Sequence, residues 1–185
     1  MERKTIRRNC WNEAGKAGIA FGLISTAYMF LVQAVGSSGM NAIIANIITF
    51  ALWGLKFGGC IWLMMVAMKK FAKDHPGATN SDTFRFGMCT GLLSALIFSA
   101  ASFANVAFIS ADIYAAQMEA AIQSYAQMMD SNTLAVVEKW IGRMPQITFF
   151  SNLFYCTAYG IVLSAILSRN IPGRDPFADY KPDQQ

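Results

Sequence analysis

Long apolar windows alternate with charged segments along this chain, and the windows decide the fold class. Three windows contain no charged residue and a fourth contains only Lys56; they are Gly18 to Val35, Ala42 to Met68, Gly87 to Ala111 and Ile147 to Leu167. A helix of about 20 apolar residues crosses roughly 30 Å of hydrocarbon, and it satisfies its own backbone hydrogen bonds there. The pattern therefore predicts an all-α membrane protein in which four transmembrane helices form an antiparallel bundle.

The links between the windows indicate the domain organisation. The first link is a tight turn, the second a loop of medium length and the third is long, so short links should make antiparallel neighbours. We expect a single four-helix transmembrane domain over residues 1–171, followed by a flexible cytoplasmic tail over 172–185. Within the domain we expect spans at about 14–35, 42–68, 84–111 and 145–168, with an outer helical segment at 112–143.

Local signals support the starts of the third and fourth spans. The segment Thr79 to Asp82 supplies side-chain oxygens that can accept hydrogen bonds from exposed helix amides. Pro145 fits the first turn of the fourth span, where its missing donor costs nothing. The segment Ala34 to Gly36 resembles a signal cleavage site, but the apolar run before it is long and begins late. We therefore expect the first span to be retained.

The charges indicate how the spans are oriented. Twelve of the fifteen lysines and arginines lie before the first span, in the second loop or in the tail, whereas the third loop has only Lys139 and Arg143. Positive charge concentrates on the cytoplasmic side of membrane proteins. We expect a multi-pass protein of the inner (cytoplasmic) membrane with both termini in the cytoplasm. The net charge of +4 follows this topology and does not indicate a nucleic-acid partner.

The long third loop has apolar residues at helical spacing. Polar cap residues interrupt the pattern, so we expect two amphipathic helices at about 112–130 and 133–143. In one interpretation these helices lie on the outer leaflet, with Trp140 as an anchor at the headgroup level. In the other, they cover the bundle as a lid or contact a partner. The methionines of this loop form no metal-binding repeat and are interpreted as gap fillers.

Lys56 is the most informative single residue, because a cation inside a span costs about 2.5 kcal/mol or more and needs a partner or water. No acidic residue lies within the four windows. A helical side chain leans toward the N-terminus of its helix, which for the second span is the outer side. We expect an outer polar pocket in which Lys56 meets Gln33, Asn105 and Asn152, with Asp112 at the rim.

Two interpretations of Lys56 stay open. In the first, the pocket takes an anionic group, such as a lipid phosphate or a carboxylate from another subunit. In the second, the long second window tilts or shifts its register, so that the Lys56 ammonium reaches the membrane interface without any pocket.

Small residues recur at a spacing of four and let neighbouring helices approach closely. They are Gly18 and Gly22 in the first span, Gly54 and Gly58 in the second, and Gly87 and Gly91 in the third. Gly54 and Gly58 lie opposite Lys56 on the helix. The second span is therefore expected to be covered on two sides, either in a central position in the bundle or at a contact in a homo-oligomer.

The sequence has no pattern typical of an enzyme site. Its one histidine, His75, is expected to be a solvated loop residue, too isolated for a catalytic triad or a zinc site. No glycine-rich phosphate loop precedes a helix, and the four cysteines include no C-x-x-C pair. We expect no catalytic residue, no cofactor and no metal.

Several short motifs together resemble a known family. They are Lys69-Lys70-Phe71, Thr83-Phe84-Arg85-Phe86-Gly87, the Gln- and Met-rich segment before Pro145, Ser168-Arg169-Asn170-Ile171-Pro172 and Arg174-Asp175-Pro176-Phe177. Nearly the whole chain resembles the four-span membrane proteins of Bacteroidota that are grouped under a numbered domain of unknown function. The resemblance implies an inner-membrane protein without an assigned activity, often beside a membrane-associated sugar transferase that uses polyprenyl-phosphate carriers. It supplies no catalytic residue.

Two functions fit these expectations. The first is a non-enzymatic membrane module that binds or positions a partner protein or a lipid-linked substrate among the membrane lipids. The alternative is a small transporter or flippase-like carrier for an anionic lipid or solute. A carrier needs a polar route through both leaflets, whereas the polar residues within the spans concentrate in the outer half. A membrane enzyme is a third class, for which acid, base and metal ligands are lacking.

Overall fold

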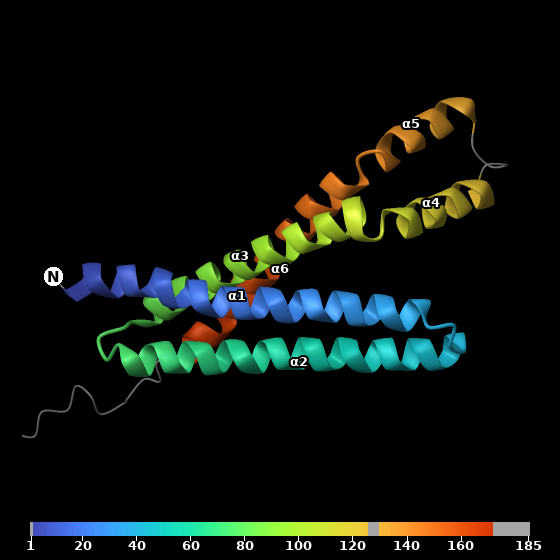
Figure 1. The fold of residues 1–185 in the computed structure, drawn as a ribbon. Helices are drawn as coiled ribbons and strands as arrows, with labels where there is room; N and C mark the ends of the chain where they lie inside the picture. Colours follow the sequence, from blue (N-terminus) through green and yellow to red (C-terminus); the bar gives the residue numbers. More distant parts are fainter. Residues whose placement is uncertain (1, 126–129, 172–185) are drawn as a thin grey trace, which may run out of the picture.

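Four long helices form an antiparallel bundle in the computed structural model, which describes residues 2–125 and 130–171 (Figure 1). They are α1 (Glu2–Ser37), α2 (Ala42–Asp74), α3 (Asn80–Ala104) and α6 (Met144–Leu167). The helices pack against one another, and the described residues contain no strand. The all-α class and the four-helix bundle predicted from the apolar windows are confirmed.

Each of the four helices is long and apolar enough to cross a membrane. The segments concerned are Asn9–Ser37, Ala42–Asp74, Asn80–Ile109 and Met144–Asn170. By length and composition, the chain is a multi-pass membrane protein. The helices run past the apolar windows into the flanking polar segments, since a helix outside the hydrocarbon needs no apolar sequence.

Smaller helical elements follow α3 and α6. A π-helix, η1 (Asn105–Ile109), directly continues α3. The helices α4 (Ala111–Tyr125) and α5 (Ser131–Ile141) come next and lie beyond the ends of α3 and α6, on the side away from α1 and α2 (Figure 1). A short 3-10 helix, η3 (Ser168–Asn170), ends α6. The predicted tail at 172–185 lies outside the described residues.

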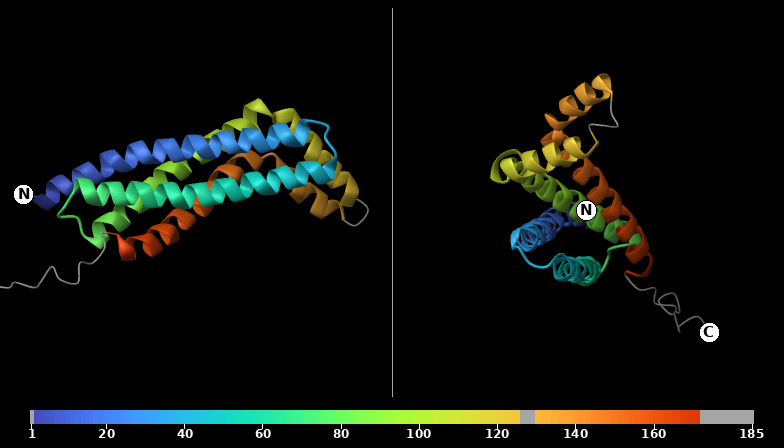
Figure 2. Two further views of the ribbon diagram at one scale, coloured as in Figure 1. Left: turned by 90° about the horizontal axis from the view of Figure 1, so that it is seen from below. Right: turned by 90° about the vertical axis from the view of Figure 1, so that its right-hand side faces the viewer.

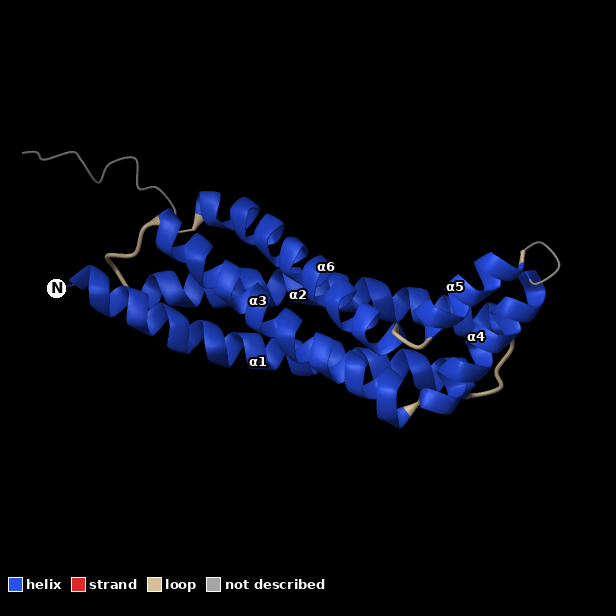
Figure 3. Ribbon diagram, turned by 90° about the horizontal axis from the view of Figure 1, so that it is seen from above, coloured by secondary structure: helices blue, strands red, loops and turns tan. Residues whose placement is uncertain are grey.

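The helix α3 is the central element of the bundle. It packs along α1 on one side and along α6 on the other, whereas α2 lies against α1 and makes little contact with α6. Figure 2 shows this arrangement end-on, and Figure 3 shows the short links at the two ends of the bundle. We call the end where α1 begins and α2 ends the terminal end, and the opposite end the α4–α5 end.

Short capped links join the long helices. Between α1 and α2, Gly39 has a φ of +67°, a left-handed conformation that glycine adopts without strain, and the Asn41 side chain accepts a hydrogen bond from the amide of Ile43. Thr79 and Asp82 form a capping box at the start of α3. These two residues belong to the segment that the sequence predicts as a cap.

Glycines allow the close approach of α3 to its two neighbours. A Cβ atom placed on Gly18 of α1 would lie 2.7 Å from the Cβ of Leu93, and one on Gly91 of α3 would lie 2.9 Å from the Cα of Gly160 on α6. These distances leave no room for a methyl group, so the helices meet backbone to backbone. The predicted small residues at such contacts are Gly18, Gly22, Gly87 and Gly91.

The glycines of α2 are not used in this way. No atom of a neighbouring element lies within 4 Å of the position that a Cβ would take on Gly54 or Gly58. Within residues 2–125 and 130–171, the structure thus excludes a central position for α2 with cover on two sides. A contact between copies of the chain at this face stays a prediction.

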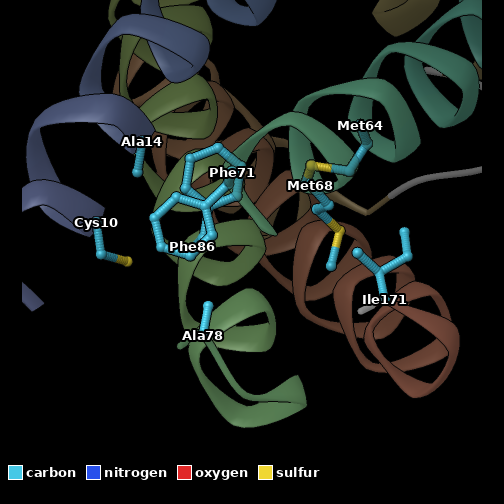
Figure 4. Close-up of a cluster of buried hydrophobic side chains, with 8 residues drawn as sticks. All are labelled: Cys10, Ala14, Met64, Met68, Phe71, Ala78, Phe86 and Ile171. Carbon is cyan, nitrogen blue, oxygen red and sulfur yellow. The ribbon is translucent and has the colours of Figure 1, made fainter. Parts of the chain in front are cut away.

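Most of the buried apolar side chains gather at the terminal end (Figure 4). The cluster comprises Cys10, Ala14, Met64, Met68, Phe71, Ala78, Phe86 and Ile171. Phe71 and Phe86 stack with their ring centroids 4.7 Å apart. The hydroxyl of Thr83 donates a hydrogen bond to the carbonyl of Ile171 at 2.6 Å, which ties the end of α6 to the start of α3. Apolar packing therefore closes this end of the bundle.

Candidate functional site

Lys56 lies on the face of α2 that is turned toward α1 and α3. Its Nζ is 4.5 Å from the ring centroid of Tyr28 and 5.0 Å from that of Phe98. Each cation–π contact contributes about 1–2 kcal/mol, so together they roughly offset an insertion cost of about 2.5–3.5 kcal/mol. The rings do not neutralise the charge, however, and the described residues provide no ion pair for Lys56.

Lys56 lines a cavity of about 170 Å³ between α1, α2, α3 and α6. This volume is far above the roughly 10–15 Å³ that one water molecule requires. The wall is mostly apolar, and its ammonium and hydroxyl groups belong to Ser25, Lys56, Thr90, Ser94, Tyr155 and Tyr159. No carboxylate of the described residues lines the cavity, so the charge that faces it is positive.

Two hydroxyls of the wall lack a hydrogen-bond partner within the described part of the chain. They are Oγ1 of Thr90, a fully buried residue, and the OH of Tyr159. Such groups are rare in proteins, because an unsatisfied buried polar group costs about 1–3 kcal/mol. Both oxygens are enclosed by neighbouring atoms, so an acceptor in the cavity would reach them only after a side-chain rotation.

The cavity opens sideways between α2 and α6. Trp53 of α2 and Tyr155 of α6 both line it, yet they are 51% and 71% exposed. One helical turn farther toward the terminal end, Phe57 and Tyr159 meet with their ring centroids 5.6 Å apart. Because α2 otherwise makes little contact with α6, the surface around Trp53 and Tyr155 leads from the lipid-facing side into the cavity.

A second polar cluster, which we call the amide network, lies nearer the α4–α5 end. Nδ2 of Asn105 donates to Oε1 of Gln33 at 3.1 Å, and the hydroxyl of Ser110 donates to Oδ1 of Asn105 at 3.0 Å. Nε2 of Gln33 donates to Oγ of Ser110 and closes the ring of three side chains. Asn105 is fully buried and Ser110 nearly so. Since each of the three side chains has a partner within the ring, the network stabilises the fold.

The π-helix explains how Ser110 joins this network. Its amide donates to the carbonyl of Asn105 at 2.8 Å, the spacing of five residues that defines a π-helix. In an α-helix, residues five apart would lie about 140° apart around the axis. A regular α-helix to the end of the third span would turn Ser110 away from Asn105, so the sequence alone does not predict Ser110 in this network.

The structure corrects the predicted four-residue pocket by dividing its members between different places. Gln33 and Asn105 meet in the amide network, whereas Lys56 contacts Tyr28 and Phe98. These rings precede Gln33 and Asn105 by five and seven residues, which corresponds to about 8–10 Å along the helices. The Lys56 ammonium therefore lies deeper in the bundle than the amides do.

The remaining predicted residues lie apart from both clusters. Asn152 of α6 is half-buried, and its side chain forms no hydrogen bond within the described residues. Asp112 is exposed in the first turn of α4. Trp140 of α5 is 61% exposed. The rim role of Asp112 and the anchor role of Trp140 stay predictions.

The structure places His75 in a packed position at the terminal end. Its side chain is 12% exposed, and Nδ1 donates to the carbonyl of Phe71 at 3.1 Å. On α1, Oε1 of Glu13 lies 3.9 Å and Nδ2 of Asn9 lies 3.5 Å from the other ring nitrogen, Nε2. The prediction of a solvated loop histidine is therefore wrong, because neighbours distant in sequence cover the ring. The described residues hold no group of three or more His, Cys, Asp or Glu side chains able to bind a metal.

The groups around Lys56 are chemically suited to an anion. They combine a positive charge, hydroxyl donors and an apolar surrounding, in which electrostatic attraction is stronger than in water. Sequence reasoning found Lys56 from its charge but missed Tyr28, Phe98, Thr90 and Tyr159. Aromatic and hydroxyl residues are ordinary in a membrane span, so only their position around the cavity distinguishes them.

Comparisons with known proteins assign the chain to a family. Searches of curated proteins and of solved structures found no match. A family model matches residues 16–169, a region that contains the Lys56 cavity, the amide network and both outer helices. The chain therefore belongs to the family described as "Protein of unknown function (DUF4199)".

Proposed function

We propose that this protein is a non-enzymatic module of the inner membrane that binds or positions a lipid-linked substrate or a partner protein. The observation that carries the proposal is the ammonium of Lys56, which has no ion-pair partner among the described residues and lines a cavity that opens sideways between two membrane helices. Such a site attracts an anionic group from the lipid phase. In the proposed orientation, both termini lie in the cytoplasm and the α4–α5 end lies outside.

The outer helices provide the proposed contact surface for a partner. No residue of α4 is buried, and Ile113 of α4 and Trp140 of α5 are 47% and 61% exposed. Apolar side chains on an outer segment typically lie on lipid headgroups or contact another protein. The family resemblance in the sequence favours, as this partner, a membrane-associated sugar transferase that uses polyprenyl-phosphate carriers in Bacteroidota.

The packing at the terminal end supports a module over a carrier. Met68, Phe71 and Phe86 are 2% exposed or less, and Met64, which lines the cavity, belongs to the same cluster. A carrier would have to open this cluster to pass a solute from the cavity to the terminal end. A binding module needs only the sideways opening.

The test is affinity purification of the full-length protein in mild detergent, with mass spectrometry of the lipids and proteins that copurify. We expect Lys56→Met to lose a copurifying lipid or protein that the parent protein retains. The matched control is Lys70→Met, which removes an exposed ammonium from the same helix and should change nothing.

Thermal unfolding in the same detergent checks that Lys56→Met is folded. If the folded variant keeps each copurifying molecule of the parent protein, the proposed function is wrong. If it keeps them but loses transport of an anionic lipid or solute in liposomes, the carrier is correct instead.

A further inference from the structure

The donors that face the Lys56 cavity favour a particular kind of anion. Lys56 supplies up to three N–H donors. Thr90 and Tyr159 line the same cavity and carry two unpartnered O–H groups, which a side-chain rotation can bring to a ligand. Ser25 and Ser94 line the same wall. A phosphate has more acceptor oxygens than a carboxylate, so it can accept hydrogen bonds from more of these donors at once.

The size of the cavity limits how much of a ligand it encloses. Its volume of about 170 Å³ is below the roughly 300–1,000 Å³ of pockets that enclose a drug-sized molecule. The cavity can therefore enclose a headgroup, and a longer hydrocarbon part of the same molecule must lie outside.

The opening between α2 and α6 provides the place for that hydrocarbon part. Trp53 and Tyr155 border the opening and are largely exposed. In the other direction, Met64 belongs to the buried cluster that closes the terminal end. A ligand can thus reach Lys56 from the lipid phase without disturbing the packed part of the bundle.

We propose that the Lys56 cavity binds the phosphate headgroup of a membrane amphiphile, which approaches between α2 and α6 and leaves its hydrocarbon chain outside. The headgroup accepts hydrogen bonds from Lys56, Thr90 and Tyr159, and the chain passes between Trp53 and Tyr155. This inference rests on the proposed function and names the ligand class of the same site.

The test uses the full-length protein in phosphatidylcholine nanodiscs that also contain phosphatidic acid, with native mass spectrometry of the retained lipid. Lys56→Met should lower the retention of phosphatidic acid about tenfold. Thr90→Val and Tyr159→Phe each remove one donor at nearly constant shape and should lower it about threefold. Lys70→Met should leave it unchanged. If Lys56→Met does not fold, the Thr90 and Tyr159 variants carry the test.

Three further probes separate the headgroup from the chain. Diacylglycerol lacks the phosphate and should not be retained, and inorganic phosphate lacks the chain and should not compete with phosphatidic acid. Retention of oleate through Lys56, without retention of phosphatidic acid, would overturn the phosphate class but leave the proposed function standing. If the probes and the copurifying molecules are all insensitive to Lys56→Met, both proposals fail.

A photoreactive phosphatidic acid tests the direction of approach. With the reactive group on the first carbons of its chain, it should label Trp53 and Tyr155 more strongly than Leu23 of α1, which is 59% exposed. Equal labelling of these three residues would overturn the approach between α2 and α6.

Discussion

The helix faces around α3 and those around α2 both contain glycines and polar side chains, but only the faces around α3 are closely packed. Around α3, glycines meet the neighbouring helices at their backbones, and the buried amides of the network are paired. Around α2, Gly54 and Gly58 meet no neighbour in the described chain. The cavity beside α2 is lined by Thr90 of α3 and Tyr159 of α6, whose hydroxyls have no partner in the same residues. The packing around α3 stabilises the bundle, whereas the face of α2 that carries Gly54 and Gly58 has no neighbour within the described residues. A spacing of small residues alone therefore does not predict which helix face is packed.

The largest effect is expected from a side chain placed at the contact between α3 and α6. Gly91→Leu should destabilise the protein by about 3 kcal/mol, since even a Cβ there meets the backbone of Gly160. Gly54→Leu, at a position with open space around it, should have little effect on thermal unfolding in detergent. A large loss of stability in Gly54→Leu would show that a second copy covers α2, so that this face is packed like the faces of α3.

A smaller loss is expected from the amide network. Asn105→Ala removes the donor to Oε1 of Gln33 and the acceptor of the Ser110 hydroxyl in an apolar region, so we expect a loss of about 2 kcal/mol in thermal unfolding. Asn152→Ala removes an amide that has no hydrogen bond within the described residues and serves as the control. If Asn105→Ala and Asn152→Ala lose the same stability, the hydrogen bonds of Asn105 do not stabilise the fold in the way we expect.

Removing a helix cap should lower the stability by less, and it should do so differently for α2 and α3. Thr79→Ala removes the capping box of α3 and should cost about 1 kcal/mol of global stability, because α3 is packed on two sides. Asn41→Ala removes the cap of α2. Because α2 has fewer contacts, this change should appear in hydrogen exchange as fraying of its first turn, with a smaller global loss.

The smallest effect concerns the pH dependence of α5. Hydrogen bonds from Thr133 hold the pKa of Asp130 below its ordinary value of 3.8. The contribution of Asp130 to the start of α5 is therefore present above pH 3.8 and is lost as the pH falls through the lowered pKa. Hydrogen exchange of the first turn of α5 should speed up in that acid range. Asp130→Asn keeps an acceptor without a charge, so its exchange should show no such step.

The sequence was sufficient for the four spans, because crossing a bilayer demands long apolar windows that little else produces. The capping box at Thr79 and the outer helix pair were also predictable, since caps and amphipathic spacing are local properties. The packed position of His75 was not, because Glu13 and Asn9 come from the distant α1. Local patterns thus predict elements better than they predict neighbours.

The candidate site was only half predictable for a related reason. A lone cation in an apolar window makes Lys56 conspicuous, but its depth relative to Gln33 and Asn105 depends on how the helices are offset along their axes. No local pattern determines that offset. The π-helix at Asn105 adds a second obstacle, because it changes the rotation of every residue after it.

The ring of hydrogen bonds at Asn105 has a consequence for how α1 and α3 find their alignment. Faces made of glycine and alanine resemble one another turn after turn, so two such helices could slide past each other at little cost. Matching one glutamine to one asparagine and one serine makes a single alignment favourable and penalises the rest. Phe98 lies about two turns from Asn105 along the same helical segment. The alignment that the amide network sets therefore also determines where Phe98 lies beside the Lys56 ammonium, although Phe98 is not part of the network.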